Sequence, residues 1–160
     1  MGQEPRAGRL SIVGASGAEV LEFGHAELAR LPANAQVADV GLVLPGKKGR
    51  AVWLDALLAG SRAAGEARFL NLASSDPNFA VSIALDELPR GALVVYELDG
   101  VPLPPEKGGP FRLLVPGHGD ECVNVKQLAR IELSRERGRD TRPADDAEHR
   151  KLHEQKGCGR

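Results

Sequence analysis

The apolar residues of this chain come in short runs separated by turns. The 160 residues include 19 glycines and 11 prolines, so the backbone changes direction often. Short apolar runs bounded by glycine, proline and small polar residues are typical of β-strands, whereas helices are usually about 10 residues or longer. The pattern predicts strands at residues 9–13, 19–23, 37–44, 68–73, 79–85, 92–98, 111–115 and 130–133.

Two other segments have the apolar spacing of short helices. Pro32 ends the first, at residues 25–31, and the second, at residues 52–59, places three leucines on one face. Strands dominate and helices are few, so we predict the α+β class, with a mixed β-sheet and short helices. The globular domain is predicted to cover residues 8–133.

The net charge and composition of the chain exclude several classes of binding partner. The formal net charge is -1, which argues against a nucleic-acid binder, because such proteins carry a basic excess. No stretch approaches the roughly 20 apolar residues that cross a membrane, and no secretory signal is visible. The two cysteines are too few for a disulfide framework. We therefore expect a cytoplasmic protein with reduced thiols and no membrane partner.

Residues 134–160 differ in composition from the rest of the chain. They include 14 charged residues among 27 and no aromatic residue. Such a segment buries too little apolar surface to offset its ordering entropy. We predict a charged C-terminal tail, partly disordered or with one short helix, that could bind a protein partner. Its His149, His153 and Cys158 have a spacing that could bind a metal, or the tail merely happens to hold them.

The segment 99–133 carries the main functional signal. Arg112 lies in a predicted strand, and Lys126 follows a loop that contains Gly117, His118 and Gly119. Two cations that flank a flexible loop rich in backbone N–H groups suit an anionic ligand such as a phosphate. Arg112, Lys126 and the loop between them form the predicted anion site.

Plainer roles remain open for both cations. Arg112 could pair with Glu97 or Glu132 on a neighbouring strand instead of binding a ligand. Lys126 could be a solvated surface charge, as most lysines are. From the residue types alone, each cation can either bind a ligand or have the plainer role.

Three further positions invite a functional interpretation beside an ordinary one. Asp76 is expected to form a turn by accepting backbone N–H bonds. Trp53 could stack on a flat ligand, although packing of a helix start onto the sheet is the simpler role. Cys122 and His118 could bind zinc, or Cys122 could be a reactive thiol beside Lys126.

Six motifs occur in an order found in one known family. The chain resembles the molybdopterin-binding domain of the sulfite oxidase family over roughly residues 9–133, and the last two motifs are its most specific part. The motifs are LxxLP at 28–32, WxxxLL at 53–58, ASSD at 73–76, VVYELDGVPL at 94–103, GGPFRLLVP at 108–116 and VKQLxxIEL at 125–133.

The resemblance implies a mixed α+β fold that holds a pterin bearing a dithiolene, a phosphate and molybdenum. It places Arg112 and Lys126 where the family recognises the cofactor, and it gives Gly117, His118 and Gly119 a place near it. Charge agrees, because the pterin phosphate is a dianion that a forked guanidinium and an ammonium can bind together. Molybdopterin is therefore the expected cofactor.

One departure from the family concerns the metal. The family places a cysteine thiolate on molybdenum, in the loop after the strand at residues 37–44. This chain has Gly41 or Leu42 there, and neither side chain can ligate a soft metal. We therefore predict no metal ligand and assign no catalytic residue.

Two functions follow from the resemblance. The first is a molybdopterin-binding, oxidoreductase-like domain that lacks the usual metal-ligating cysteine and, if active, transfers an oxygen atom or electrons at molybdenum. The alternative is a catalytically inactive binding module of the same fold. That module would bind another anionic small molecule or a protein partner.

Overall fold

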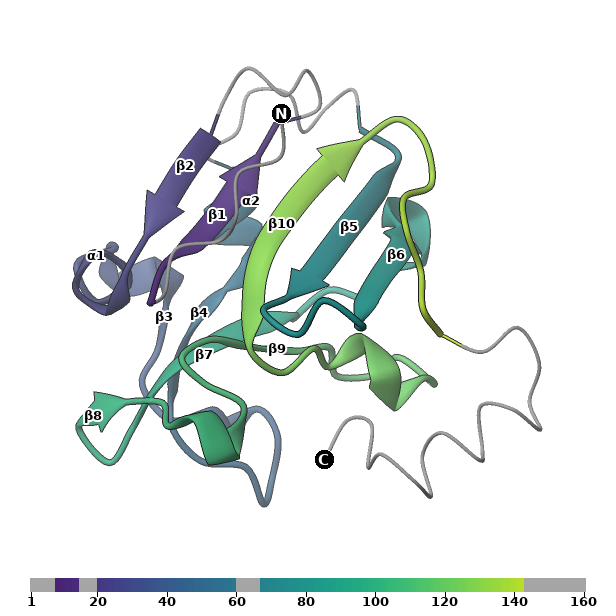
Figure 1. The fold of residues 1–160 in the computed structure, drawn as a ribbon. Coiled ribbons are helices and arrows are strands. Elements are labelled where there is room, and N and C mark those ends of the chain that lie inside the picture. Colours follow the sequence, from purple (N-terminus) through teal and green to yellow (C-terminus); the bar gives the residue numbers. More distant parts are fainter. Residues whose placement is uncertain (1–7, 15–19, 60–66, 143–160) are drawn as a thin grey trace.

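A computed structural model describes residues 8–14, 20–59 and 67–142 of the chain. Two five-stranded sheets build the fold (Figure 1). In sheet A, the first strand of the chain lies parallel to the last one, and the remaining pairs are antiparallel. The order of sheet A is β2 (Val20–Phe23), β1 (Leu10–Val13), β10 (Leu128–Ser134), β5 (Phe69–Ser74) and β6 (Ala80–Ala84).

Sheet B is entirely antiparallel. Its long strand β7 pairs with one neighbour on one edge and with two short strands on the other. The strands are β3 (Gln36–Val37), β4 (Arg50–Trp53), β7 (Leu93–Leu98), β8 (Val101–Pro102) and β9 (Arg112–Leu114), and both β8 and β9 pair with β7.

The helices of the described residues are all short. No helix among them is both long and apolar enough to cross a membrane. Mixed strand directions and few short helices confirm the predicted α+β class. The α-helices are α1 (His25–Ala29) and α2 (Leu54–Leu58), and the 3-10 turns are η1 (Ala33–Ala35), η2 (Val40–Leu42), η4 (Leu85–Glu87), η5 (Pro105–Lys107) and η6 (Glu121–Val123).

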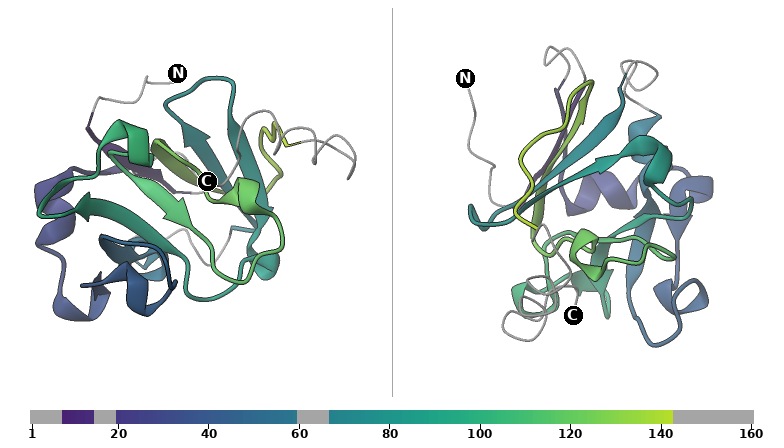
Figure 2. Two further views of the ribbon diagram at one scale, coloured as in Figure 1. Left: turned by 90° about the horizontal axis from the view of Figure 1, so that it is seen from below. Right: turned by 90° about the vertical axis from the view of Figure 1, so that its right-hand side faces the viewer.

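The main core lies between the two sheets, an arrangement that can be followed in Figure 2. Sheet A contributes Leu10, Leu72 and Ile131, and sheet B contributes Val94 and Tyr96. Aliphatic side chains supply most of this core, as expected for a chain that is only 4% aromatic. Burial of their apolar surface is the main force that holds the sheets together.

Strand β7 is buried on both faces, as its sequence predicted. Val94 and Tyr96 point into the main core, whereas Leu93 and Val95 belong to a second apolar cluster. Alternation of side chains along a strand produces this division. The second cluster consists of Val37, Val40, Ala51, Leu93, Val95, Leu103 and Leu114.

The prediction of a strand at residues 37–44 was wrong for most of that segment. Only Gln36–Val37 form a strand, and a 3-10 turn follows at Val40–Leu42. The Asp39 carboxylate accepts a hydrogen bond of 2.9 Å from the Gly41 N–H, which stabilises the turn. Aspartate commonly competes with strand formation in this way.

The last described residues lie along the edge of sheet A rather than apart from it. In Figure 1 they run beside β6. Thr141 N donates to Ala80 O at 2.8 Å, and its hydroxyl accepts from Ala80 N at 3.1 Å. Residues 138–142, which we call the strap, therefore extend the packed domain beyond residue 133. Residues 143–160, including His149, His153 and Cys158, lie outside the described residues.

Candidate functional site

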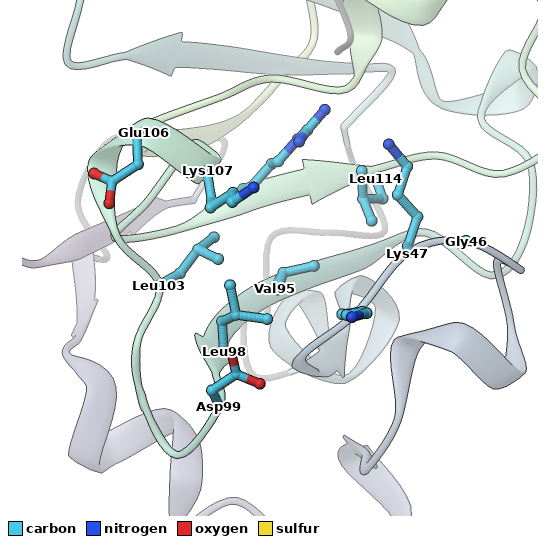
Figure 3. Close-up of a pocket in the computed structure, with 11 residues that line it drawn as sticks. Gly46, Lys47, Val95, Leu98, Asp99, Leu103, Glu106, Lys107 and Leu114 are labelled. Atoms are coloured by element: carbon cyan, nitrogen blue, oxygen red, sulfur yellow. The ribbon is translucent and has the colours of Figure 1, made fainter.

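A pocket of about 550 Å³ opens on the face of sheet B that carries the second apolar cluster (Figure 3). This volume is in the range that small-molecule sites usually have, about 300–1,000 Å³. Three loops and two strands supply the lining. The residues are Gly46, Lys47, Lys48, Val95, Leu98, Asp99, Leu103, Glu106, Lys107, Arg112 and Leu114.

The floor of the pocket is apolar. Val95, Leu103 and Leu114 each belong to the second cluster and also line the cavity. They come from β7, from the segment after β8 and from β9, so the pairing of β7 with its neighbours brings them together. An apolar floor of this kind suits the flat ring of an organic ligand.

The polar part of the lining is mainly basic. Lys47, Lys48, Lys107 and Arg112 contribute four positive charges, against two negative charges from Asp99 and Glu106. The chain as a whole has a formal net charge of -1, so positive charge is concentrated here. A concave surface with an excess of positive charge raises the local concentration of anionic ligands.

Arg112 is the sequence-predicted residue that lines the pocket. It is the first residue of β9 and pairs in register with Val95 of β7. Burial lowers the pKa of the Arg112 guanidinium from its usual value. Arginine nevertheless stays protonated in proteins, so a fixed positive charge lies partly out of water at the edge of the cavity. An anion bound there would stabilise that charge.

Gly108 brings Arg112 and Lys126 together. A Cβ atom at Gly108 would lie 3.0 Å from Arg112 Cδ and 3.2 Å from Lys126 Cγ, so both side chains pass close over this glycine. Its φ of +95° is a conformation that other residues rarely adopt. Gln127 N donates to Gly108 O at 2.6 Å, which fixes the Lys126 backbone beside it. Lys126 itself is not among the residues that line the pocket.

Gly117, His118 and Gly119 are not brought to the pocket. They follow the far end of β9, and none of them lines the cavity. The Nδ1 atom of His118 accepts a hydrogen bond of 3.0 Å from Asp120 N, so the ring helps to order its own loop. Asp120 in turn accepts from Arg142 of the strap at 3.1 Å.

Sequence reasoning missed the three lysines of the pocket. Lys47 and Lys48 lie in the loop Pro-Gly-Lys-Lys-Gly, and Lys107 directly precedes the Gly-Gly-Pro corner. Adjacent lysines between two glycines were the available signal. The position of Lys47 and Lys48 over the cavity depends on the pairing of β4 with β7, which a local sequence pattern does not reveal.

The place of the family's thiolate holds no metal ligand. A Cβ at Gly41 would lie 3.0 Å from Lys47 O and 3.1 Å from Asp39 Oδ1, and the Leu42 residue is 84% exposed. Within the described residues, no group of three or more His, Cys, Asp or Glu side chains could hold a metal ion. Gly41 and Leu42, which do not line the pocket, therefore do not fit a thiolate-held molybdenum.

Other candidate residues have structural roles. Asp76 accepts a hydrogen bond of 2.9 Å from Asn78 N, which confirms the predicted turn. Trp53 packs against the second cluster at the start of α2. Cys122 is fully buried, so its thiol is not exposed in the way that a reactive or zinc-binding cysteine requires.

Comparisons with known proteins agree with this fold. A chain of the sulfane dehydrogenase SoxCD from Paracoccus pantotrophus matches with a TM-score of 0.55 and 22% sequence identity, over 81% of this chain. The match covers 38% of that chain, and at 22% identity the similarity is one of fold alone. No curated protein sequence matches significantly. The family model described as "oxidoreductase molybdopterin binding domain" matches residues 46–141, so the chain belongs to the molybdopterin-binding oxidoreductase domain family.

Proposed function

We propose that the pocket binds the phosphate-bearing pterin of a molybdopterin. The observation that carries the proposal is that the Arg112 side chain, which lines a cavity with an apolar floor, passes over Gly108 beside the stem of Lys126. The guanidinium offers a forked pair of donors to phosphate oxygens, and the ammonium adds a second charge. The apolar floor would accept the pterin ring.

The donor set supports binding of the organic part more than binding of the metal. Lysine ammonium groups and a guanidinium repel a metal cation and offer it no lone pair, and a soft metal prefers a thiolate. The described lining of the pocket contains no sulfur. When bound, the cofactor would supply the redox chemistry, whereas the residues of this chain bind and orient it. We therefore assign no catalytic step to these residues.

The test is to express the chain in cells that make the cofactor and to measure pterin and molybdenum in the purified protein. We expect pterin to copurify with the unaltered protein and to be lost in Arg112→Gln. Arg90→Gln removes one charge from an exposed position outside the pocket and should retain the pterin. A pterin-free protein that also fails to take up added cofactor contradicts the proposal.

A second candidate is a binding module that carries out no reaction. The absence of a thiolate among the described residues of the pocket favours it. Its ligand would be another anion, or a protein partner bound through the charged tail. The variant Gly41→Cys tests it, because robust molybdenum-dependent activity in that variant would contradict a purely binding role.

The cytoplasmic location also stays a prediction, which cell fractionation would check.

A further inference from the structure

Lys47 and Lys48 are basic residues of the pocket that the proposed phosphate site at Arg112 does not include. Figure 3 shows Lys47 on one side of the cavity and Lys107 on the other, with Val95 between them. The proposed phosphate site at Arg112 is supplied by β9. Lys47 and Lys48 come from a different part of the chain, the loop between η2 and β4. With Lys107 of η5, the cations of the pocket thus come from three segments of the chain.

The loop that carries these lysines is anchored to the fold. Val40 N donates to Gly49 O at 2.9 Å, and Lys47 N donates to Leu44 O at 3.0 Å. Gly49 has a φ of +117°, and a Cβ there would lie 2.5 Å from Glu97 O and 3.2 Å from Val95 Cγ1. Only glycine lets the loop lie this close to β7. The backbone therefore holds the two lysines over the pocket.

The charges in the lining are unevenly distributed. The two carboxylates, Asp99 and Glu106, come from the β7–β8 turn and from η5. The lining residues of the lysine loop are Gly46, Lys47 and Lys48, so this segment contributes only positive charge to the pocket. Neighbouring lysines repel each other, and an anion between them relieves that repulsion.

We infer that Lys47 and Lys48 form a second anion subsite, so that the pocket takes an organic ligand with two anionic groups. One group binds at Arg112 and the other at the lysine pair. This inference rests on the proposed function for the Arg112 end. It deepens that function because it specifies the charge pattern of the ligand. A cavity of about 550 Å³ has room for more than one phosphate group and for the carbon skeleton between them.

Matched sugar phosphates test the inference. Fructose 6-phosphate and fructose 1,6-bisphosphate differ by one phosphate, and calorimetric titration at constant ionic strength gives both affinities. We expect the bisphosphate to bind about tenfold more tightly, as one added charge-assisted contact allows. In Lys47→Gln/Lys48→Gln this ratio should fall to near one, while the monophosphate affinity is retained. Lys47→Arg/Lys48→Arg should keep the ratio.

The control removes the same number of charges elsewhere. Arg30 and Arg90 are exposed and do not line the pocket, so Arg30→Gln/Arg90→Gln should leave the ratio unchanged. Equal affinities for the two sugars in the unaltered protein overturn the second subsite, as does an equal loss of the ratio in the control. Arg112→Gln should weaken both sugars. If the monophosphate does not bind, the proposed Arg112 site fails. If it binds as tightly as the bisphosphate, only the lysine subsite fails, so the two results can be told apart.

Discussion

At the scale of single residues, two glycines place the charges of the pocket. Gly108 lets the Arg112 and Lys126 side chains pass side by side, and Gly49 lets the lysine loop lie against β7. Arg112 could be placed at an anion site from sequence, because it belongs to one of the most specific motifs of the family, and it does line the pocket, whereas Lys126 does not. Lys47 and Lys48 could not be placed in this way, because their contribution depends on a backbone contact between Gly49 and Glu97.

The variant Gly49→Ala should both destabilise the protein and weaken anion binding. The new methyl group meets Glu97 O in a backbone conformation that alanine avoids, so we expect a loss of about 2–4 kcal/mol in the free energy of unfolding. Gly46→Ala is the control, since its φ of +91° is also positive but nothing lies within 4 Å of the added Cβ. Its loss should be about 1–2 kcal/mol. Equal losses in urea unfolding would show that the close contact has no effect.

At the scale of elements, the strap completes an exposed sheet edge. Strand β6 is the last strand of sheet A, and edge strands left open pair readily with other chains. Asp140, Thr141 and Arg142 satisfy backbone groups of this edge, including the Ser82 carbonyl. The sequence did not reveal the strap, because its residues are charged or small. Polar residues can hydrogen-bond to a sheet edge as a further strand would, although their sequence resembles that of a solvated tail.

An ion pair within the strap should make stability depend on pH. Burial alone would raise the pKa of Asp140, but hydrogen bonds and the charge of Arg142 outweigh that effect and hold its pKa below the usual value. Because the folded-state pKa is lowered, the stabilisation is fully present above the unfolded-state pKa of about 4. It is lost as the pH falls through the folded-state pKa.

Asp140→Asn tests this dependence. We expect the variant to lose about 1–3 kcal/mol in the free energy of unfolding at neutral pH, as is usual for hydrogen bonds to charged groups. The difference from the unaltered protein should shrink as the pH falls below about 4, where the carboxylate of the unfolded chain becomes protonated, and it should vanish below the lower folded-state pKa. Asp86→Asn, at an exposed position in η4, should change little at either pH. A difference that is constant across the pH range would contradict the role assigned to the charge.

At the scale of the whole molecule, the sequence revealed the class of fold but not the arrangement of strands. Runs of alternating apolar residues identified most strands. The nearly continuous apolar run at residues 92–98 correctly predicted that β7 is buried on both faces. The pairing of Ser11 with Arg130 in the parallel β1–β10 pair could not be seen, because it joins opposite ends of the domain. Such long-range pairing is decided by the shared core and not by local pattern.

Two truncations should show where the folded domain ends. A chain that stops at Leu133 lacks the strap, whereas one that stops at Arg142 retains it. We expect the shorter chain to unfold at a temperature several degrees lower and to self-associate more, since β6 is uncovered. Thermal unfolding with light scattering measures both effects. Identical melting and scattering curves would contradict the structural role of residues 134–142.

The parallel pair of β1 and β10 has a consequence for the order of events during synthesis. All strands of sheet B lie between residues 36 and 114, so this sheet is complete in sequence well before the last strand is made. Sheet A needs β10 between β1 and β5, and it cannot close until that strand has left the ribosome. The basic pocket is built on sheet B. The residues that line the pocket, from Gly46 to Leu114, are therefore synthesised before β10, whereas Lys126 of the proposed phosphate site is synthesised only just before that strand.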